Sequence, residues 1–235
     1  MDYPIEFTDI FTVLVNNMLF PMEVLDVVST GSQQAVSFCD VYHSQIGFTI
    51  NIGGNDFAIQ NVDYDANVLT VALTPTINVG DTATINRPFP FYGTPIAADV
   101  EVGAAKDTMV TTPLIWLRLN YTENGGDIMS TVVRTVKCEI YFLASADHDK
   151  ELTSDLVGQQ IKPMRRLLLN FIQAMRNDTT NFSMDDYSYD NIEIMTKFGI
   201  IAQQKGAARD MIGQGLTGLC LKSSIDLVGQ QNCLC

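Results

Sequence analysis

The first 86 residues of this chain contain no lysine and no arginine. They contain ten acidic residues, whereas the remaining 149 residues contain 14 bases and 17 acids. Surfaces that bind nucleic-acid phosphates or anionic lipids rely on clustered basic side chains, so this part of the chain is excluded from such a role. A purely negative surface favours a basic partner or a place where DNA must be held off. An acidic face that only keeps the protein soluble is the alternative.

Histidine, long apolar runs and charge in general are also scarce. The chain has only two histidines, His43 and His148, which are few for a zinc site or for acid–base catalysis. No apolar run approaches the ~18 residues that span a bilayer, and acids rather than a basic signal-peptide start follow Met1. We therefore expect a protein that is kept in a cytosol and has no membrane association. Charged residues make up only 17% of the chain, which suggests that sister subunits cover part of its surface.

Five cysteines do not form a disulfide framework. Cys39, Cys138 and Cys220 each lie in an apolar stretch, so we expect them in the core. Cys233 and Cys235 are too close in sequence for an easy bond, and their spacing is not that of a zinc site. No metal or cofactor is expected.

Three short motifs suggest chemistry, but each fits a structural role better. Residues 213–218 match the glycine pattern of dinucleotide-binding proteins, yet they precede a strand instead of following one. Residues 63–67 begin like a calcium loop, but Val68 and Thr74 occupy the places that need Gly and Glu, so a hairpin turn is expected. Residues 147–149 are Asp-His-Asp, and neighbours in a loop rarely converge on one ion. Because no set of catalytic residues converges, no enzymatic activity is predicted.

The N-terminal half predicts one helix followed by a β-rich module. Residues 4–19 have apolar side chains at helical spacing, with Pro21 expected to end the helix, and residues 22–30 fit a strand or a helical turn. Residues 31–92 then show short runs of β-branched and aromatic residues between turn residues. They predict five strands, at 35–42, 46–52, 56–62, 68–73 and 81–86, with hairpin turns at 53–55 and 65–67. Strands of this length and spacing predict a small β-barrel or sandwich.

Residues 87–112 predict a long connection without clear periodicity. Its first part places Phe89, Phe91 and Tyr92 among prolines, and such side chains are not expected to stay in water. We expect them to dock on the core of this subunit or on a neighbouring subunit, so these three are candidate subunit-interface residues.

The C-terminal half predicts strands and one strong helix. Strands are predicted at 114–120, 132–144, 192–200 and 217–227. A helix capped by Thr153 or Ser154 carries an apolar stripe from Met164 to Met175, and Pro163 should kink it. The predicted fold is α+β: a mixed-sheet platform with packed helices, formed by residues 1–30 and 93–235, with the acidic β-module of residues 31–92 inserted into it.

The same helix carries the one dense basic cluster of the sequence, Lys162, Arg165 and Arg166, followed by Arg176. One interpretation is a solvated helix face. The other is a contact with an acidic surface, such as the β-module of a neighbouring subunit, in a head-to-tail arrangement of the kind that closes rings.

Several segments of the chain resemble a group of virion-associated proteins encoded by phages and prophages of Bacteroidetes. The segments that carry the resemblance are Phe48–Gly54, Tyr92–Ala97, Thr112–Leu117, Ile161–Met164, Lys197–Ile200 and Leu216–Leu219. The α+β platform is also similar to the tail-terminator and tail-completion folds of tailed phages. The Cys233-Leu234-Cys235 end departs from the pattern, in which one cysteine or none is expected.

The resemblance implies a structural protein of the virion neck, head–tail connector or tail-completion ring, made in the host cytoplasm. Such a protein would form a sixfold or twelvefold homo-oligomeric ring and contact other neck, tail or portal proteins. DNA would pass through the ring without specific binding, which a negative lumen favours. Asp56, Asp63 and Asp65 are the candidate lumen-facing acids.

Two other functions stay open at the level of sequence. The first alternative is a carbohydrate-binding or adhesin module of a virion or cell surface, which would show exposed aromatic residues in the β-module, and Tyr42, Phe48, Phe57 and Tyr64 are the available ones. The second is an enzyme or processing factor.

Overall fold

The computed structural model divides the chain into two compact units. The first, called the platform here, comprises residues 1–17 and 88–235, and the second, called the module, comprises residues 18–87. The structure describes residues 6–18, 21–41, 44, 46, 48–85, 88–94, 113–119, 121–125, 132–145, 156–183, 191–198, 200–202, 208–210 and 216–228.

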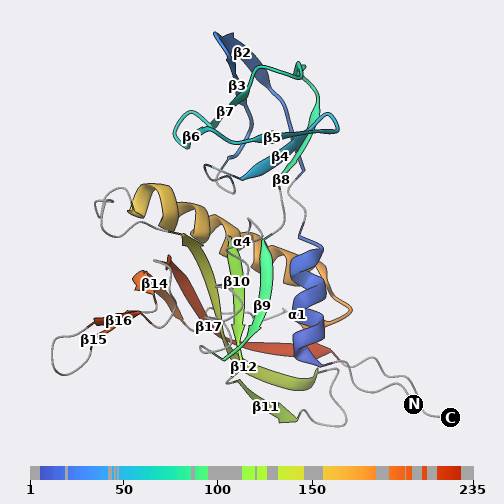
Figure 1. Cartoon of the computed structure of the whole chain (residues 1–235). Coiled ribbons are helices and arrows are strands. Elements are labelled where there is room, and N and C mark those ends of the chain that lie inside the picture. The colour runs from blue at the N-terminus through green and yellow to red at the C-terminus, as the bar shows by residue number, and fades with distance from the viewer. Residues whose placement is uncertain are drawn as a thin grey trace. The chain divides into compact units, whose positions relative to one another are not determined.

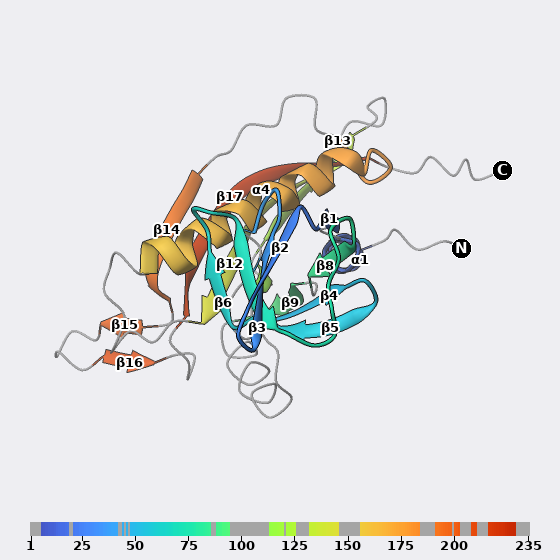
Figure 2. The ribbon, with the colours of Figure 1, turned by 90° about the horizontal axis from the view of Figure 1, so that it is seen from above.

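The module is an antiparallel barrel of short strands (Figure 1). Its strands are β1 (Pro21–Glu23), β2 (Asp26–Thr30), β3 (Gln33–Ser37), β4 (Thr49–Ile52), β5 (Asn55–Ala58), β6 (Asn61–Asp63), β7 (Val68–Ala72) and β8 (Thr82–Ile85). They pair in two paths, β1-β8-β4-β5 and β2-β3-β7-β6. Figure 2, which views the module from above, shows β4, β5 and β8 on one side and β2, β3 and β6 on the other.

Two bent corners join these paths and close the barrel. Between β1 and β2, the Val24 N–H donates to Asp81 O and the Leu25 N–H donates to Ser37 O, at 3.0 and 2.9 Å. Between β5 and β6, the N–H groups of Ile59 and Gln60 donate to Phe48 O and Thr70 O, both at 2.8 Å. Each corner therefore bonds to both paths, and the backbone groups at the bends are satisfied. The strand predicted over residues 56–62 is in fact two strands separated by this second corner.

Turn residues set the register of the module. Ile52 pairs with Asn55 across Gly53 and Gly54, whose φ angles of +57° and +84° are those of a two-residue hairpin, as predicted. Asp63 pairs with Val68 across the second predicted turn. Inside the barrel, the buried Gln34 side chain donates to the carbonyls of Ala72, Leu73 and Pro75 and accepts from Ile77 N–H.

The platform combines helices with a seven-stranded mixed sheet. Its elements are α1 (Phe7–Asn16), β9 (Phe89–Gly93), β10 (Leu114–Arg118), β11 (Thr122–Gly125), β12 (Val132–Ser145), the π-helical turn η2 (Leu156–Ile161), α4 (Lys162–Asn177), β13 (Phe182–Ser183), β14 (Asn191–Phe198), the hairpin strands β15 (Ile200–Ala202) and β16 (Ala208–Asp210), and β17 (Leu216–Val228). The sheet order is β13-β17-β12-β10-β9, with β11 also on β12 and β14 also on β17.

Both helices pack on one face of this sheet, the inner face (Figure 1). Phe171 of α4 contacts Phe142 of β12 and Phe11 of α1, with ring centroids 5.5 and 6.1 Å apart. The alternation predicted for residues 132–144 and 217–227 is confirmed, and it places Ile140 and Leu221 on this buried face. The opposite face is called the outer face here.

The predicted balance of helix and strand is wrong, because the described chain is mostly β. Its two α-helices form in the segments that were predicted to be helical. Residues 22–30, for which a strand or a helical turn was expected, belong to strands β1 and β2 and the corner between them, and residues 122–125 add a strand that was not predicted. The module also begins earlier than the expected residue 31, because β1 pairs with β8 and β2 with β3. Pro21 does not end α1, which stops at Asn16, but begins β1.

The aromatic part of the expected connection is strand β9, so that prediction is also corrected. β9 runs parallel to β10, with Leu114 opposite Phe89 and Arg118 opposite Gly93. Proline lacks the N–H of an inner strand and is tolerated at a sheet edge, which is where the strand order places β9. The prolines are therefore the reason that this edge strand was not predicted from the sequence pattern.

The predicted kink near Pro163 takes the form of a change in helix type. Residues 156–161 are π-helical, and the α-helix starts at Lys162, so that Pro163 lies where the helix changes type. The expected caps at residues 153 and 154 lie outside the described residues.

Gly218 of β17 lies directly against the backbone of β12. A Cβ atom at this position would lie 1.9 Å from the carbonyl oxygen of Phe142. We expect Gly218→Ala to force the two longest strands apart and to lower the free energy of unfolding by at least about 3 kcal/mol. Urea denaturation followed by the fluorescence of Trp116, the one tryptophan in the chain, measures this.

Gly158→Ala is the matched control, because a Cβ there meets no atom within 4 Å. Its effect should stay within about 0.5 kcal/mol. Equal stability of the two variants would contradict the close approach of the strands.

Candidate functional site

The predicted basic cluster lies on the solvent side of α4. Lys162, Arg165 and Arg166 are exposed, as is Arg176 in the last turn of the helix. Leu169, 41% exposed, lies among them. Residues 162, 165, 166, 169 and 176 fall within about 100° of one another around a helix of 3.6 residues per turn, and we call them the basic stripe. Helix α4 therefore carries four positive charges, no negative one, and an apolar side chain on a single face.

The three candidate lumen-facing acids are all exposed on the surface of the module. Asp56 accepts a hydrogen bond from Asn51 Nδ2 at 2.7 Å. Asp63 has a local role, because its Oδ1 accepts the N–H groups of Asp65 and Ala66 at 3.1 and 2.9 Å and so holds the β6–β7 turn. Asp65 is exposed at the tip of that turn. Of the three, only Asp63 has a clear structural role in a turn.

The candidate interface aromatics separate into one buried and two exposed residues. Phe91 is 4% exposed, and its ring lies 6.2 Å from that of Trp116, so it belongs to the core of its own platform. Phe89 and Tyr92 are 38% and 46% exposed along the edge strand. Only these two remain available to a neighbouring subunit.

The outer face of the platform sheet carries a polar network that the sequence pattern did not indicate. Glu139 Oε2 accepts hydrogen bonds from Arg118 Nη1 at 2.7 Å and from the Tyr141 hydroxyl at 2.8 Å. On the next strand, Lys222 Nζ lies 2.8 Å from Glu193 Oε1. The alternation of residues 132–144 placed Glu139 and Tyr141 on one face, but their partners come from strands far away in the sequence.

Aromatic stacking adjoins this network. The rings of Trp116 and Tyr141 stack with centroids 4.9 Å apart, and Trp116 Nε1 donates to Gly93 O at 3.0 Å. Burial, followed by the hydrogen bond to Glu139, raises the pKa of Tyr141 above its usual value. Burial alone would raise the pKa of Glu139, but hydrogen bonds from Tyr141 and Arg118 outweigh it and hold that pKa below its usual value. The network therefore favours a charged Glu139 and a neutral Tyr141.

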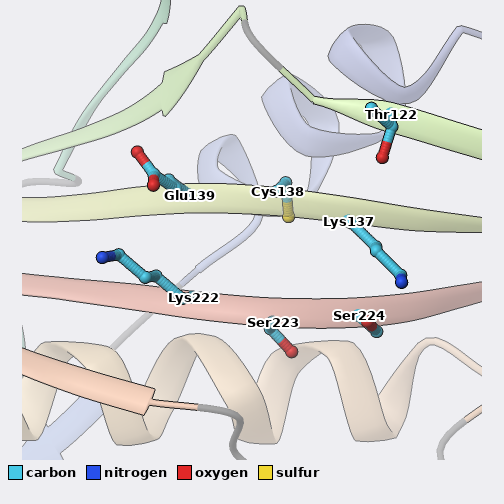
Figure 3. A pocket seen from close by; sticks show the side chains of 7 residues that line it. All are labelled: Thr122, Lys137, Cys138, Glu139, Lys222, Ser223 and Ser224. Atoms are coloured by element: carbon cyan, nitrogen blue, oxygen red, sulfur yellow. The ribbon is translucent and has the colours of Figure 1, made fainter.

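A shallow hollow with a volume of about 470 Å³ opens beside the network. Figure 3 shows the residues that line it, which are Thr122, Lys137, Cys138, Glu139, Lys222, Ser223 and Ser224. Two ammonium groups and several hydroxyls suit an anionic group, but Glu139 and Glu193 already balance much of the positive charge. The hollow has the chemistry of a weak anion site and no arrangement for covalent catalysis.

The remaining sequence motifs give no further site among the described residues. In the part of the chain that the structure describes, no three His, Cys, Asp or Glu side chains are placed to share a metal ion. Burial raises the pKa of Cys138 to about 12 and that of Cys220 to about 11, and both are buried as expected. Cys39 is exposed, so its predicted place in the core is wrong. His43, His148, residues 213–215 and the two C-terminal cysteines lie outside the described residues.

None of the helices described is both long and apolar enough to cross a membrane.

Comparisons with known proteins add little to this picture. No family model matches the chain, and no curated protein does. Among solved structures, the crystal structure of LumP complexed with flavin mononucleotide is similar over 92% of this chain and 97% of its own, at 8% sequence identity and a TM-score of 0.23. A likeness this loose carries no argument about fold or ligand.

Glu139 should make the stability of the platform depend on pH. A carboxyl whose pKa is lowered by folding stabilises the fold above its unfolded pKa of about 4.3 and loses that contribution as the pH falls through its folded value. We expect Glu139→Gln to cost about 1 kcal/mol at pH 7, after allowing for its partial exposure, and progressively less below about pH 4. Thermal melts between pH 7 and pH 3 measure the difference.

Glu123→Gln on the neighbouring strand β11 is the control, because Glu123 pairs with Arg134 at a longer 3.3 Å. A wild-type advantage over Glu139→Gln that did not shrink in acid would show that the network does not depend on the charge of this residue.

Proposed function

We propose that this protein is a structural component of a tailed-phage virion, a subunit of a ring around the DNA channel in the neck or at the tail-completion position. The observation that carries the proposal is the contrast between the acidic module and the basic face of helix α4. Residues 18–86 of the module hold seven acids and no base, whereas the exposed face of α4 in the platform holds four bases and no acid. A chain with two surfaces of opposite sign is suited to head-to-tail association, which generates rings when the rotation closes.

The acidic module also suits a channel wall. DNA that must slide through a ring is held back by every Lys or Arg that contacts a phosphate, because such contacts release counterions and bind tightly. A lumen lined with carboxylates avoids such contacts with the DNA phosphates. The exposed Asp56 and Asp65 are the side chains that we assign to it, whereas Asp63 holds the turn that carries Asp65. The segments that resemble phage virion proteins support the same function.

The carbohydrate-binding alternative needs exposed aromatic side chains on the module. Phe48 and Phe57 are 8% and 3% exposed and belong to its core. Tyr64 is half-buried, and its hydroxyl donates to Ser44 O at 2.8 Å. Tyr42 lies outside the described residues. No described observation favours this function over the ring.

The purified protein should assemble into a discrete ring of sixfold or twelvefold symmetry. Light scattering at two protein concentrations gives the native mass, and negative-stain electron microscopy gives the symmetry. Rings that appear or grow in number on concentration agree with the proposal. A protein that stays monomeric at every concentration, also when mixed with portal particles, would contradict it.

Charge reversal at the tip of the β6–β7 turn should make the ring retain DNA. Asp65→Lys is preferred to a change at Asp63, which holds the turn. We expect unchanged assembly and measurable binding of double-stranded DNA at about 50 mM salt that disappears near 200 mM, whereas the wild type binds none. Fluorescence anisotropy with labelled DNA measures the binding.

Two controls distinguish the effect of the position of the lysine on DNA binding from the effect of the change in net charge. Asp65→Asn removes the charge without adding a cation and should not bind DNA. Asp9→Lys places the same added charge on the exposed surface of α1, outside the module. If the two lysine variants bound DNA equally well, Asp65 would have no special place at the channel.

A further inference from the structure

The cations at the start of the basic stripe repel one another along α4. Lys162 lies three residues from Arg165 and four from Arg166, and like charges at these spacings repel by about 0.2–0.5 kcal/mol per pair. The helix dipole favours cations only near the C-terminus, where Arg176 lies. With Leu169 also exposed, the stripe combines electrostatic self-repulsion with exposed apolar surface. These are features of a surface that gains from being covered.

The module presents a complementary surface on the outside of its β2-β3-β7-β6 sheet, which we call the module face. Register places Asp26, Ser37, Val68 and Asp63 in one row across the four strands, and Val28, Ala35, Thr70 and Asn61 in the next. These side chains point outward, because the intervening Val36, Leu69 and Val71 fill the core. Val28 is 55% exposed, and Asp26 and Asp63 are exposed at the two edges.

The dimensions of the two surfaces agree. Asp26 and Asp63 lie three strand spacings apart, about 14 Å. Along α4, eleven residues separate Arg165 from Arg176, which is about 16 Å at 1.5 Å per residue. A helix laid across the strands thus places an arginine near each carboxylate. Leu169 then falls between them, over the apolar and small side chains of the module face.

We propose that the basic stripe of α4 in one copy of this chain docks on the module face of a second copy. The contact is heterologous, because each copy offers a different surface to each neighbour, and it deepens the ring proposed above, on which it rests for self-association. Opposite charges at both edges fix the direction of the helix across the strands and exclude the like-charged pairings of stripe with stripe or face with face.

Two full-length variants test the contact by exchanging its charges. The first, the acidic-stripe variant, carries Lys162→Glu, Arg165→Glu and Arg176→Glu. The second, the basic-face variant, carries Asp26→Lys, Asn61→Lys and Asp63→Asn. The asparagine at 63 keeps a side-chain oxygen for the N–H groups of Asp65 and Ala66, so the turn is preserved. Lys137→Glu, at an exposed lysine of β12, is the control for a charge change elsewhere.

Each variant alone should associate at least about tenfold more weakly than the wild type, because like charges then face each other. An equimolar mixture of the two should recover association, since an acidic stripe meets a basic face and a basic stripe meets an acidic face. Light scattering of each sample and of the mixture measures this. The association of the wild type should also weaken as salt rises from about 0.05 to 0.5 M.

The other outcomes overturn the contact and are distinguishable from one another. Recovery in the mixture requires a contact between chains, so two weakened variants that stay apart when mixed point to a contact within one chain. Rings that form equally well in the acidic-stripe variant refute the contact and leave the ring standing. A wild type that never associates refutes both. Loss of association in Lys137→Glu as well would show a general effect of charge.

Discussion

The platform depends on the antiparallel pairing of β12 with β17. The register runs from Val132 opposite Val228 to Ser145 opposite Leu216, and every other strand of the sheet except β9 pairs directly with one of these two. Long ladders need close backbone approach along their whole length, and at Gly218 no side chain fits. The inner face of the ladder holds α4 by Phe142 and Phe171, so the ladder also determines which side of α4 is turned to solvent.

Both faces of this ladder bury apolar side chains, and the outer face also carries ion pairs. On the inner face, buried apolar side chains provide most of the stabilisation, since apolar area removed from water is the largest favourable contribution to folding. On the outer face, the aromatic stack of Trp116 on Tyr141 gives way along the strands to the Arg118–Glu139 and Lys222–Glu193 pairs. Pairs with this much exposure add little to stability, so the outer face contributes to the fold through its buried apolar cluster, which includes Trp116, Tyr141 and Leu143.

Periodicity and turn chemistry were sufficient to predict the elements whose packing is regular. The alternation of residues 132–144 and 217–227, the apolar stripe of α4 and the turn at Gly53-Gly54 all agree with the structure.

Other elements could not be predicted from the sequence. Prolines concealed the edge strand β9, and the corner at Ile59-Gln60 carries no turn signal because it bends within a continuous run of strand residues. The Glu139 network was missed for another reason: its members come from β10 and β12, and a single sequence does not show which strands are neighbours. The basic stripe could be predicted from residue spacing alone. The proposed module face could be recognised only from the register of four strands.

The acidity of the module and the positive charge of the basic stripe have no origin in the stability of the unit that carries each. The barrel is closed by backbone hydrogen bonds and filled by apolar side chains, and neither requires its surface to be free of lysine and arginine. An acidic barrel repels itself, and the cations of the basic stripe repel one another. Each unit is therefore slightly less stable than a surface of mixed charge would make it. Such a cost is understandable where the surface acts on something outside the unit, and an acidic module and a basic helix face on one chain make another copy of the same chain the simplest partner.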